Sequence, residues 1–289
     1  MRLQKFRKEY KLGDVNQFMM EKIKEYYTES VHYEWKRLVQ DAYHRLEFDT
    51  TLRFLKKYLP KKGLILDAGG GPGRYTIELA KQGYDVVLLD LAPGNLEFAK
   101  RQIKKADVQN KVKGIVEGSI TDLSKFTANT FDAVICLGGP LSHVEGKKNR
   151  DKAVSELIRV AKRDAPIFVS VFGKFGCLTL ALAGWPDEIS MTPHFRKFVK
   201  TGEDSLWHGR YYAHYFTSEE LRSIFTLWDF KILELVGLEG LATPHIKAIN
   251  KLAKNKKAWK NWLESHYKLC THPIVAGISV HMLIIGRKK

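Results

Sequence analysis

The sequence predicts an α/β fold in which a seven-stranded, mostly parallel sheet is covered by helices on both faces. From residue 61 onward, short apolar runs alternate with segments of helical periodicity. These apolar runs are continuous, as is typical of parallel strands that are buried on both faces. The chain has 289 residues, of which 44% are hydrophobic and 28% charged. This balance excludes a disordered chain and suits one or two domains.

Residues 1–60 are expected to form an N-terminal helical cap that precedes this alternation. Apolar residues recur at helical spacing through residues 14–59. Pro60 ends the pattern, because proline lacks the amide hydrogen and clashes with the preceding helical turn.

Residues 61–172 and 229–289 are expected to form the α/β core. Its strands are expected at 64–66, 86–89, 112–116, 131–137, 167–172, 230–236 and 279–285, and its helices at 76–81, 93–105 and 150–162. A lysine-rich helical excursion is expected at 244–268.

Residues 173–228 interrupt this rhythm and are expected to form an insert after the fifth strand. The segment is rich in aromatic and histidine side chains. It could form a second small core, or a lid that closes over a site at the carboxyl ends of the strands and shapes a substrate pocket. The lid is the preferred interpretation, because that edge of an open parallel sheet is where ligands bind.

A glycine-rich loop follows the first strand of the core. The strand ends in Asp67, and glycines follow at positions 69, 70, 71 and 73. Glycines at such a strand-to-helix turn allow the backbone to approach a ligand closely, although a tight turn alone would also explain them. The dinucleotide fingerprint requires a glycine at the sixth place of the loop, where this chain has Arg74. The loop therefore departs from the pattern of nicotinamide-dependent enzymes.

Asp90 ends the second strand, 17 residues after Gly73. A carboxylate at this place can accept hydrogen bonds from both hydroxyls of a ribose. Taken alone it could also be a turn residue ahead of Pro93, but together with the loop it predicts a nucleoside site.

The loop, the acid and their spacing resemble motif I of the class I S-adenosylmethionine-dependent methyltransferases, and in particular their small-molecule, UbiE-like group. The resemblance implies a Rossmann-like fold, S-adenosylmethionine as cofactor and S-adenosylhomocysteine as product. It is strongest over residues 60–172. The cofactor-binding residues that it implies are Tyr27, Arg37, Asp67, Gly69, Gly70, Gly71, Gly73, Asp90, Leu91, Ser119, Ile120, Leu137 and Gly138.

Two of these groups carry particular roles in the resemblance. Ser119 and Ile120 follow the third strand, where the family binds adenine, and serine stands where many relatives have an acid. Leu137 and Gly138 follow the fourth strand, where backbone carbonyls would meet the amino group of the cofactor.

Histidines are the candidate general bases, because an oxygen or nitrogen acceptor that carries a proton needs a group that titrates near neutral pH. His143 follows the fourth strand, which faces the methyl group in this family. His208 and His214 lie in the insert, where Tyr211 is a further candidate for turnover. No metal is expected, since no Cys-x-x-Cys pair occurs and the three cysteines lie far apart.

The methyl acceptor is expected to be a small molecule, with a carboxylate, an oxygen or a nitrogen as its nucleophile. The net charge of +16 keeps tRNA open as an alternative, as do the lysines of 247–260 with Trp259 and Trp262 among them. The tail from Tyr267 loosely resembles tRNA carboxymethoxyuridine methyltransferases. A third possibility is a non-catalytic binding subunit with the same fold.

The cysteines also bear on the compartment. Widely spaced cysteines suit a reducing environment, so a cytoplasmic protein is expected. Neither a signal peptide nor a membrane span is expected. The sequence leaves the acceptor atom and the oligomeric state open.

Overall fold

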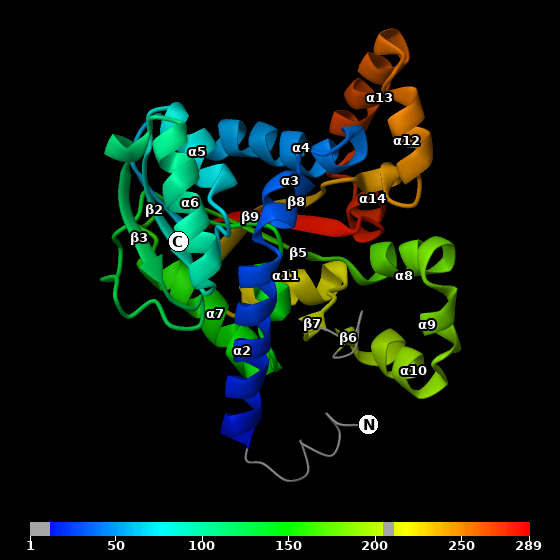
Figure 1. Cartoon of the computed structure of the whole chain (residues 1–289), viewed down its shortest axis with the longest axis horizontal. Helices are drawn as coiled ribbons and strands as arrows, with labels where there is room; N and C mark the ends of the chain where they lie inside the picture. Colours follow the sequence, from blue (N-terminus) through cyan, green and yellow to red (C-terminus); the bar gives the residue numbers. More distant parts are fainter. Residues whose placement is uncertain (1–11, 205–210) are drawn as a thin grey trace.

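The computed structural model describes residues 12–204 and 211–289, and its centre is a seven-stranded sheet (Figure 1). The strand order is β3-β2-β1-β4-β5-β9-β8, and within this sheet β9 alone runs antiparallel to its neighbours. The strands are β1 (Leu64–Ala68), β2 (Asp85–Asp90), β3 (Val112–Glu117), β4 (Ala133–Cys136), β5 (Pro166–Phe172), β8 (Phe230–Gly237) and β9 (His281–Lys288). The predicted Rossmann-like, mostly parallel sheet is thereby confirmed.

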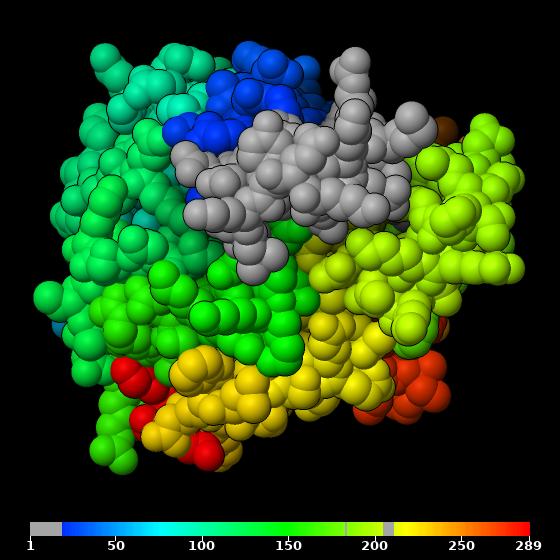
Figure 2. Space-filling model, turned by 90° about the horizontal axis from the view of Figure 1, so that it is seen from below, coloured from blue at the N-terminus to red at the C-terminus, as the bar shows by residue number. Residues whose placement is uncertain are grey.

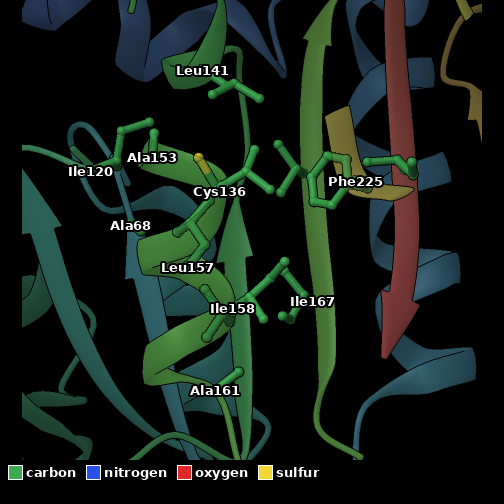
Figure 3. Packing of buried hydrophobic residues seen from close by; sticks show 14 of the residues in the cluster. Ala68, Ile120, Cys136, Leu141, Ala153, Leu157, Ile158, Ala161, Ile167 and Phe225 are labelled. Atoms are coloured by element: carbon green, nitrogen blue, oxygen red, sulfur yellow. The ribbon is translucent and has the colours of Figure 1, made fainter. Parts of the chain in front are cut away.

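One face of the sheet is covered by α7 (Lys147–Val160) and α11 (Ser218–Thr226). Figure 3 shows side chains of α7, among them Leu157, packed against Cys136 of β4 and Ile167 of β5. These strand residues are fully buried, as their continuous apolar pattern predicts. The packing fixes the position of the segment that follows β4.

The opposite face is covered by α4 (Ala42–Tyr58), α5 (Arg74–Lys81) and α6 (Pro93–Lys105). Helix α4 comes from the predicted cap, yet Phe54 and Leu55 are buried against the sheet. The carboxyl-terminal half of the predicted cap is therefore a part of the core.

The insert is shorter than the predicted range 173–228. Helix α11 packs Leu221 and Phe225 into the main core, so it belongs to the helical layer of the sheet. The remainder is α8 (Lys174–Gly184), α9 (Pro186–Ser190), α10 (Thr192–Thr201) and the short strands β6 (Glu203–Asp204) and β7 (Ala213–His214). These elements have a small core of their own around Phe198 and Tyr215. Figure 2 shows α8 to α10, in yellow-green, standing out from one side of the molecule.

The helices before α4 are α2 (Leu12–Glu29) and α3 (Val31–Arg37). Helix α2 lies across the carboxyl edge of the sheet and contacts α6. Lys24 of α2 forms a 2.7 Å salt bridge with Glu117 at the end of β3. Gly94 of α6 lies so close to Thr28 that a Cβ atom would come within 2.9 Å of its Cα. The predicted cap thus closes over the edge where the strands end.

The lysine-rich excursion is formed by α12 (Ile246–Leu252) and α13 (Lys256–Leu269), followed by α14 (Pro273–Gly277). Helices α12 and α13 project away from the sheet (Figure 1). Trp259 and Trp262 pack against Tyr43 and Leu46 of α4, so these tryptophans face inward. Within the described ranges, the chain contains no helix both long and apolar enough to cross a membrane.

We expect Gly94→Val to detach α2 from the core without unfolding the sheet. The new side chain would collide with the backbone of Thr28, and overpacking of this kind costs ~1–3 kcal/mol. Limited proteolysis should cleave α2 at least tenfold faster than in the unchanged protein. Gly184→Val is the control, because a Cβ there meets nothing within 4 Å. Equal cleavage of the two variants would show that this contact does not hold the cap.

Candidate cofactor and acceptor site

The glycine loop folds back over the end of β2. The amides of Gly69 and Gly70 both donate to the carbonyl of Leu89, at 2.7 and 3.1 Å. Gly69 and Gly71 have φ angles of 78° and 56°, which side chains other than glycine rarely adopt. A Cβ at Gly69 would also lie 2.5 Å from the ring of Pro140. Sterics therefore require glycine at this turn.

Asp90 holds the loop from the neighbouring strand. One carboxylate oxygen accepts from the amide of Gly71 at 2.8 Å. The other accepts from the amide of Ala92 at 2.9 Å and from the side chain of Asn95 at 3.1 Å. Burial raises the pKa of Asp90, and these three hydrogen bonds oppose the shift. A carboxylate has about four acceptor positions, so Asp90 retains capacity for a hydroxyl from the cavity.

Asp67 lies beneath the loop and is fully buried. The hydroxyl of Thr76 donates to its carboxylate at 2.6 Å, and burial raises the pKa of Asp67 to about 7. A Cβ at Gly70 would fall 2.5 Å from this carboxylate. Asp67 was expected among the cofactor-binding residues, but it does not line the cavity. Its carboxylate instead packs beneath Gly70.

A cavity of about 310 Å³ lies between the loop, the ends of the strands and the cap. Most of the predicted site residues line it. They are Tyr27, Arg37, Gly69, Gly70, Gly71, Asp90, Leu91, Ser119, Ile120, Leu137, Gly138 and His143. Gly73 does not line it, because its role is to let α5 pack closely on Ala99 of α6.

His143 and Tyr27 form a hydrogen-bonded pair in the cavity wall. The Nδ1 atom of His143 lies 3.1 Å from the carbonyl oxygen of Tyr212, which can only accept, so Nδ1 carries the proton. The Nε2 atom is then the acceptor for the hydroxyl of Tyr27, 2.7 Å away. Burial lowers the pKa of His143 to about 4, although the hydrogen bond to the carbonyl of Tyr212 opposes this shift. His143 is therefore neutral at physiological pH.

Comparison with known proteins shows which family has this arrangement. Residues 65–164 match the family model of a methyltransferase domain. The chain contains a class I methyltransferase domain. Its cofactor is S-adenosylmethionine. The matched residues run from β1 through α7 and so include the glycine loop, Asp90 and His143.

Curated relatives match this domain, and two of them illustrate the range. A glycine/sarcosine N-methyltransferase of Aphanothece halophytica is 28% identical over 139 residues, which are 48% of this chain and 51% of that protein. A ubiquinone biosynthesis O-methyltransferase of Xanthomonas axonopodis pv. citri is 28% identical over 153 residues, which are 51% of this chain and 61% of that protein. The chain spans about half the length of the first of these relatives.

Among solved structures, a S-adenosylmethionine-dependent methyltransferase from Methanosarcina mazei superposes with a TM-score of 0.54 at 21% identity. The match covers 81% of this chain and 96% of that one. At this level of identity the likeness shows the shared fold.

The methyltransferase domain fits S-adenosylmethionine at each part of the cavity. A Cβ at Gly71 would meet only Asn95, at 3.8 Å, so the space above the loop is open for the methionine part of the cofactor. Asp90, the residue expected to hold the ribose, lines the cavity beside the loop. Leu91 and Ile120 offer apolar walls for adenine. The hydroxyl of Ser119 is hydrogen-bonded to the hydroxyl of Thr121, so it has a partner without the adenine ring.

Tyr211 and His214 lie outside the cavity lining. His214 is buried, and its Nε2 atom lies 2.7 Å from a carboxylate oxygen of Glu220 on α11. The structure thus places His214 away from the cavity, and its role in catalysis stays a prediction. Tyr211 packs behind the pair, with its ring 5.1 Å from that of His143 and 6.0 Å from that of Tyr27. His208 lies outside the described residues.

Several lining residues were not predicted, because their signal is tertiary. Helix α2 supplies Met19, Ile23 and Lys24, whose helical spacing indicated only a packed face. Other unpredicted lining residues include Glu34, Leu38, Arg74, Asn95, Glu145 and Asn149. Asn95 and Arg74 had a local signal, since Asn95 follows Asp90 within the first turn of α6 and Arg74 directly follows the glycine loop.

Arg37 joins the cavity wall to a buried ion network. Its guanidinium forms two hydrogen bonds with Glu47 of α4, one of them 2.5 Å long. His281 of β9 lies 3.6 Å from Glu47 and 2.6 Å from Glu239. Burial opposes the ionisation of Glu47, but Arg37 and His281 lower its pKa. Although Glu47, Glu239 and His281 are close enough to ligate an ion, Arg37 already supplies the compensating positive charge.

We expect Gly71→Val to abolish the binding of S-adenosylmethionine while the fold persists. The side chain would project into the space of the methionine part and would also impose a strained φ, at a cost of ~1–3 kcal/mol. Calorimetry should show an affinity at least 100-fold lower. Gly83→Val is the matched control, because Gly83 has a φ of 94° and no neighbour within 4 Å. Equal loss of affinity in both variants would indicate strain and not occlusion.

Proposed function

We propose that the protein transfers a methyl group from S-adenosylmethionine to an oxygen or nitrogen of a small molecule. The observation that carries the proposal is one cavity that is lined both by the glycine loop with Asp90 and by the Tyr27–His143 pair. Residues of α2 also line this cavity of about 310 Å³, and its size suits a small acceptor. The names of the two relatives include both an N- and an O-methyltransferase.

The cofactor supplies an activated methyl group, which the acceptor's lone pair takes as the carbon–sulfur bond breaks and the electron pair stays on sulfur. The domain's own contribution is to align the acceptor and to remove its proton. Tyr27 can accept a hydrogen bond from the acceptor while its own hydroxyl donates to His143. The proton then moves through Tyr27 to Nε2 of His143. A carboxylate acceptor would need no such pair, so the pair favours a proton-bearing nucleophile.

The acceptor can be sought by incubating the protein with methyl-labelled S-adenosylmethionine and size-fractionated cell extract, with and without RNase. Label in the low-mass fraction supports the proposal. If calorimetry shows cofactor binding but no fraction becomes labelled, the third possibility, a non-catalytic binding subunit, is favoured. The three cysteines are free and buried in the structure, and we propose a cytoplasmic location on that basis.

We expect His143→Gln to lower kcat roughly 10²–10⁴-fold, since a positioned general base contributes about that much. Cofactor affinity should change less than threefold. Because the neutral form of His143 is the base and its pKa is lowered to about 4, kcat of the unchanged protein should stay level as the pH falls from 7 to 5. The rate should decline only as the pH passes through about 4.

A second variant, Tyr27→Phe, removes the hydroxyl that is bonded to His143. Its control is Tyr33→Phe, because Tyr33 is exposed on α3 and does not line the cavity. Tyr27→Phe should lower kcat at least tenfold, and Tyr33→Phe should leave it unchanged. A fall of kcat on the acid side with a midpoint near pH 6.5 would contradict the assignment of His143 as the base, since it would report a histidine of ordinary pKa.

A second candidate function is the methylation of tRNA, and the surface of α12 and α13 favours it. Seven lysines there are exposed: Lys247, Lys251, Lys254, Lys256, Lys257, Lys260 and Lys268. In the described part of the chain none of them lies in a salt bridge. Unpaired cations on a projecting element suit a polyanion. The relatives named above lend tRNA no support, and the tryptophans face inward, so this candidate rests on charge alone.

If α12 and α13 bind RNA, Lys254→Glu with Lys257→Glu should weaken tRNA binding more than tenfold. The slope of log K against log salt should fall by roughly 1.5–2, because about two phosphate contacts are lost. Lys104→Glu with Lys105→Glu on α6 carries the same change in charge and is the control. Equal effects of the two variants would indicate non-specific attraction by net charge.

A further inference from the structure

Glu34 presents a carboxylate to the cavity from α3. Its side chain is 17% exposed and lines the cavity. Its carboxylate accepts a hydrogen bond from the Nε atom of Arg37, and this bond is long, at 3.3 Å. Burial raises the pKa of Glu34, and Arg37 only partly opposes this. The ionised form of Glu34 would therefore be stabilised by a positive charge in the cavity.

The network behind Glu34 has more negative than positive groups. Arg37 and His281 face the carboxylates of Glu34, Glu47 and Glu239. Glu47 has both oxygens on Arg37 and Glu239 is bonded to His281, so Glu34 is the member with the weakest compensation. A buried group of like charges is stable only when a counter-charge is near, and here the open side faces the cavity.

The other charged groups of the cavity wall do not supply that counter-charge. Lys24 is paired with Glu117, and Arg74 donates to the carbonyl of Trp35 and stacks on its ring. A further carboxylate, Glu145, lines the cavity two residues after His143. The cavity thus presents acids at its acceptor end while its cations are engaged elsewhere.

Glu34 shares the cavity wall with the Tyr27–His143 pair. Glu34 acts electrostatically on the hydroxyls of Tyr27 and Tyr211, which surround His143. Tyr27 lines the same cavity, and an aromatic ring can bind a cation. Asp90, the residue expected to mark the ribose, instead holds the glycine loop at the end of β2.

We propose that the methyl acceptor is an amine that enters as an ammonium ion and is held by Glu34 against the ring of Tyr27. This inference rests on the proposed function and narrows its acceptor to nitrogen. An ammonium has no lone pair, so it must lose one proton before it can accept a methyl group. Tyr27 takes that proton and passes its own to Nε2 of His143, from which it returns to water. The methylated nitrogen again bears a positive charge and leaves as the ammonium.

The test uses the full chain saturated with S-adenosylhomocysteine, so that only the acceptor end is free. The probes are benzylamine and benzyl alcohol, which have the same size and differ in charge. Calorimetry should show benzylamine binding at least tenfold tighter than benzyl alcohol. Glu34→Gln should remove that preference, a change of ~1.4 kcal/mol. Glu25→Gln, at an exposed acid of α2 outside the cavity, should preserve it.

A second measurement follows labelled methyl transfer to a panel of primary and secondary amines, matched alcohols and matched carboxylic acids. Transfer to amines, with a KM raised at least tenfold in Glu34→Gln and a cofactor Kd within threefold, supports the inference. Transfer to alcohols or acids alone overturns it and leaves the proposed function standing. The inference is also overturned if Glu34→Gln lowers cofactor affinity by as large a factor as it raises KM. Glu34 would then bind the amino group of the cofactor.

The remaining outcomes separate the two proposals. If the cofactor does not bind at all, the proposed function fails. If the cofactor binds and no panel compound is labelled, the calorimetric measurement decides alone. In that case, a Glu34→Gln variant that still prefers benzylamine to benzyl alcohol overturns the amine assignment.

Discussion

The hydrogen bonds of Asp90 are the constraint on which the site depends. Its carboxylate joins the glycine loop after β1 to the first turn of α6 after β2. Because β1 and β2 are adjacent parallel strands, both loops emerge at one edge of the sheet. The carboxylate fixes their separation and leaves the backbone at Gly71 facing open space. Cofactor binding thus follows from a junction that also stabilises the core.

A second junction joins the N-terminal helices to the C-terminal part of the sheet at the same edge. Arg37 and Glu47 come from the N-terminal helices, and Glu239 and His281 come from the C-terminal part of the sheet. Breaking a buried pair of this kind typically costs ~3–5 kcal/mol, because one charge remains uncompensated. The network therefore anchors the cap while it places Glu34 in the cavity wall. The same arrangement that stabilises the fold sets the charge that an acceptor meets.

The insert reaches the site through one backbone carbonyl and one aromatic ring. The carbonyl of Tyr212 selects the tautomer of His143, and the ring of Tyr211 packs behind Tyr27. His214 instead packs on Phe216 of the main core and pairs with Glu220 of α11. An aromatic, histidine-rich composition indicated a lid, but the described insert residues that reach the pair are those next to β7.

The sequence by itself determined the sheet, the glycine loop and Asp90, because each depends on neighbours within one strand-loop-helix unit. Continuous apolar runs and left-handed turns are local requirements, and their spacing along the chain is enough to predict them. Only the tertiary structure decided which of Tyr27, His143 and His214 meet, that Asp67 lies beneath the loop, and that Glu34 faces the cavity. Those outcomes depend on contacts between segments far apart in the chain, whose geometry has no periodic signal in the sequence.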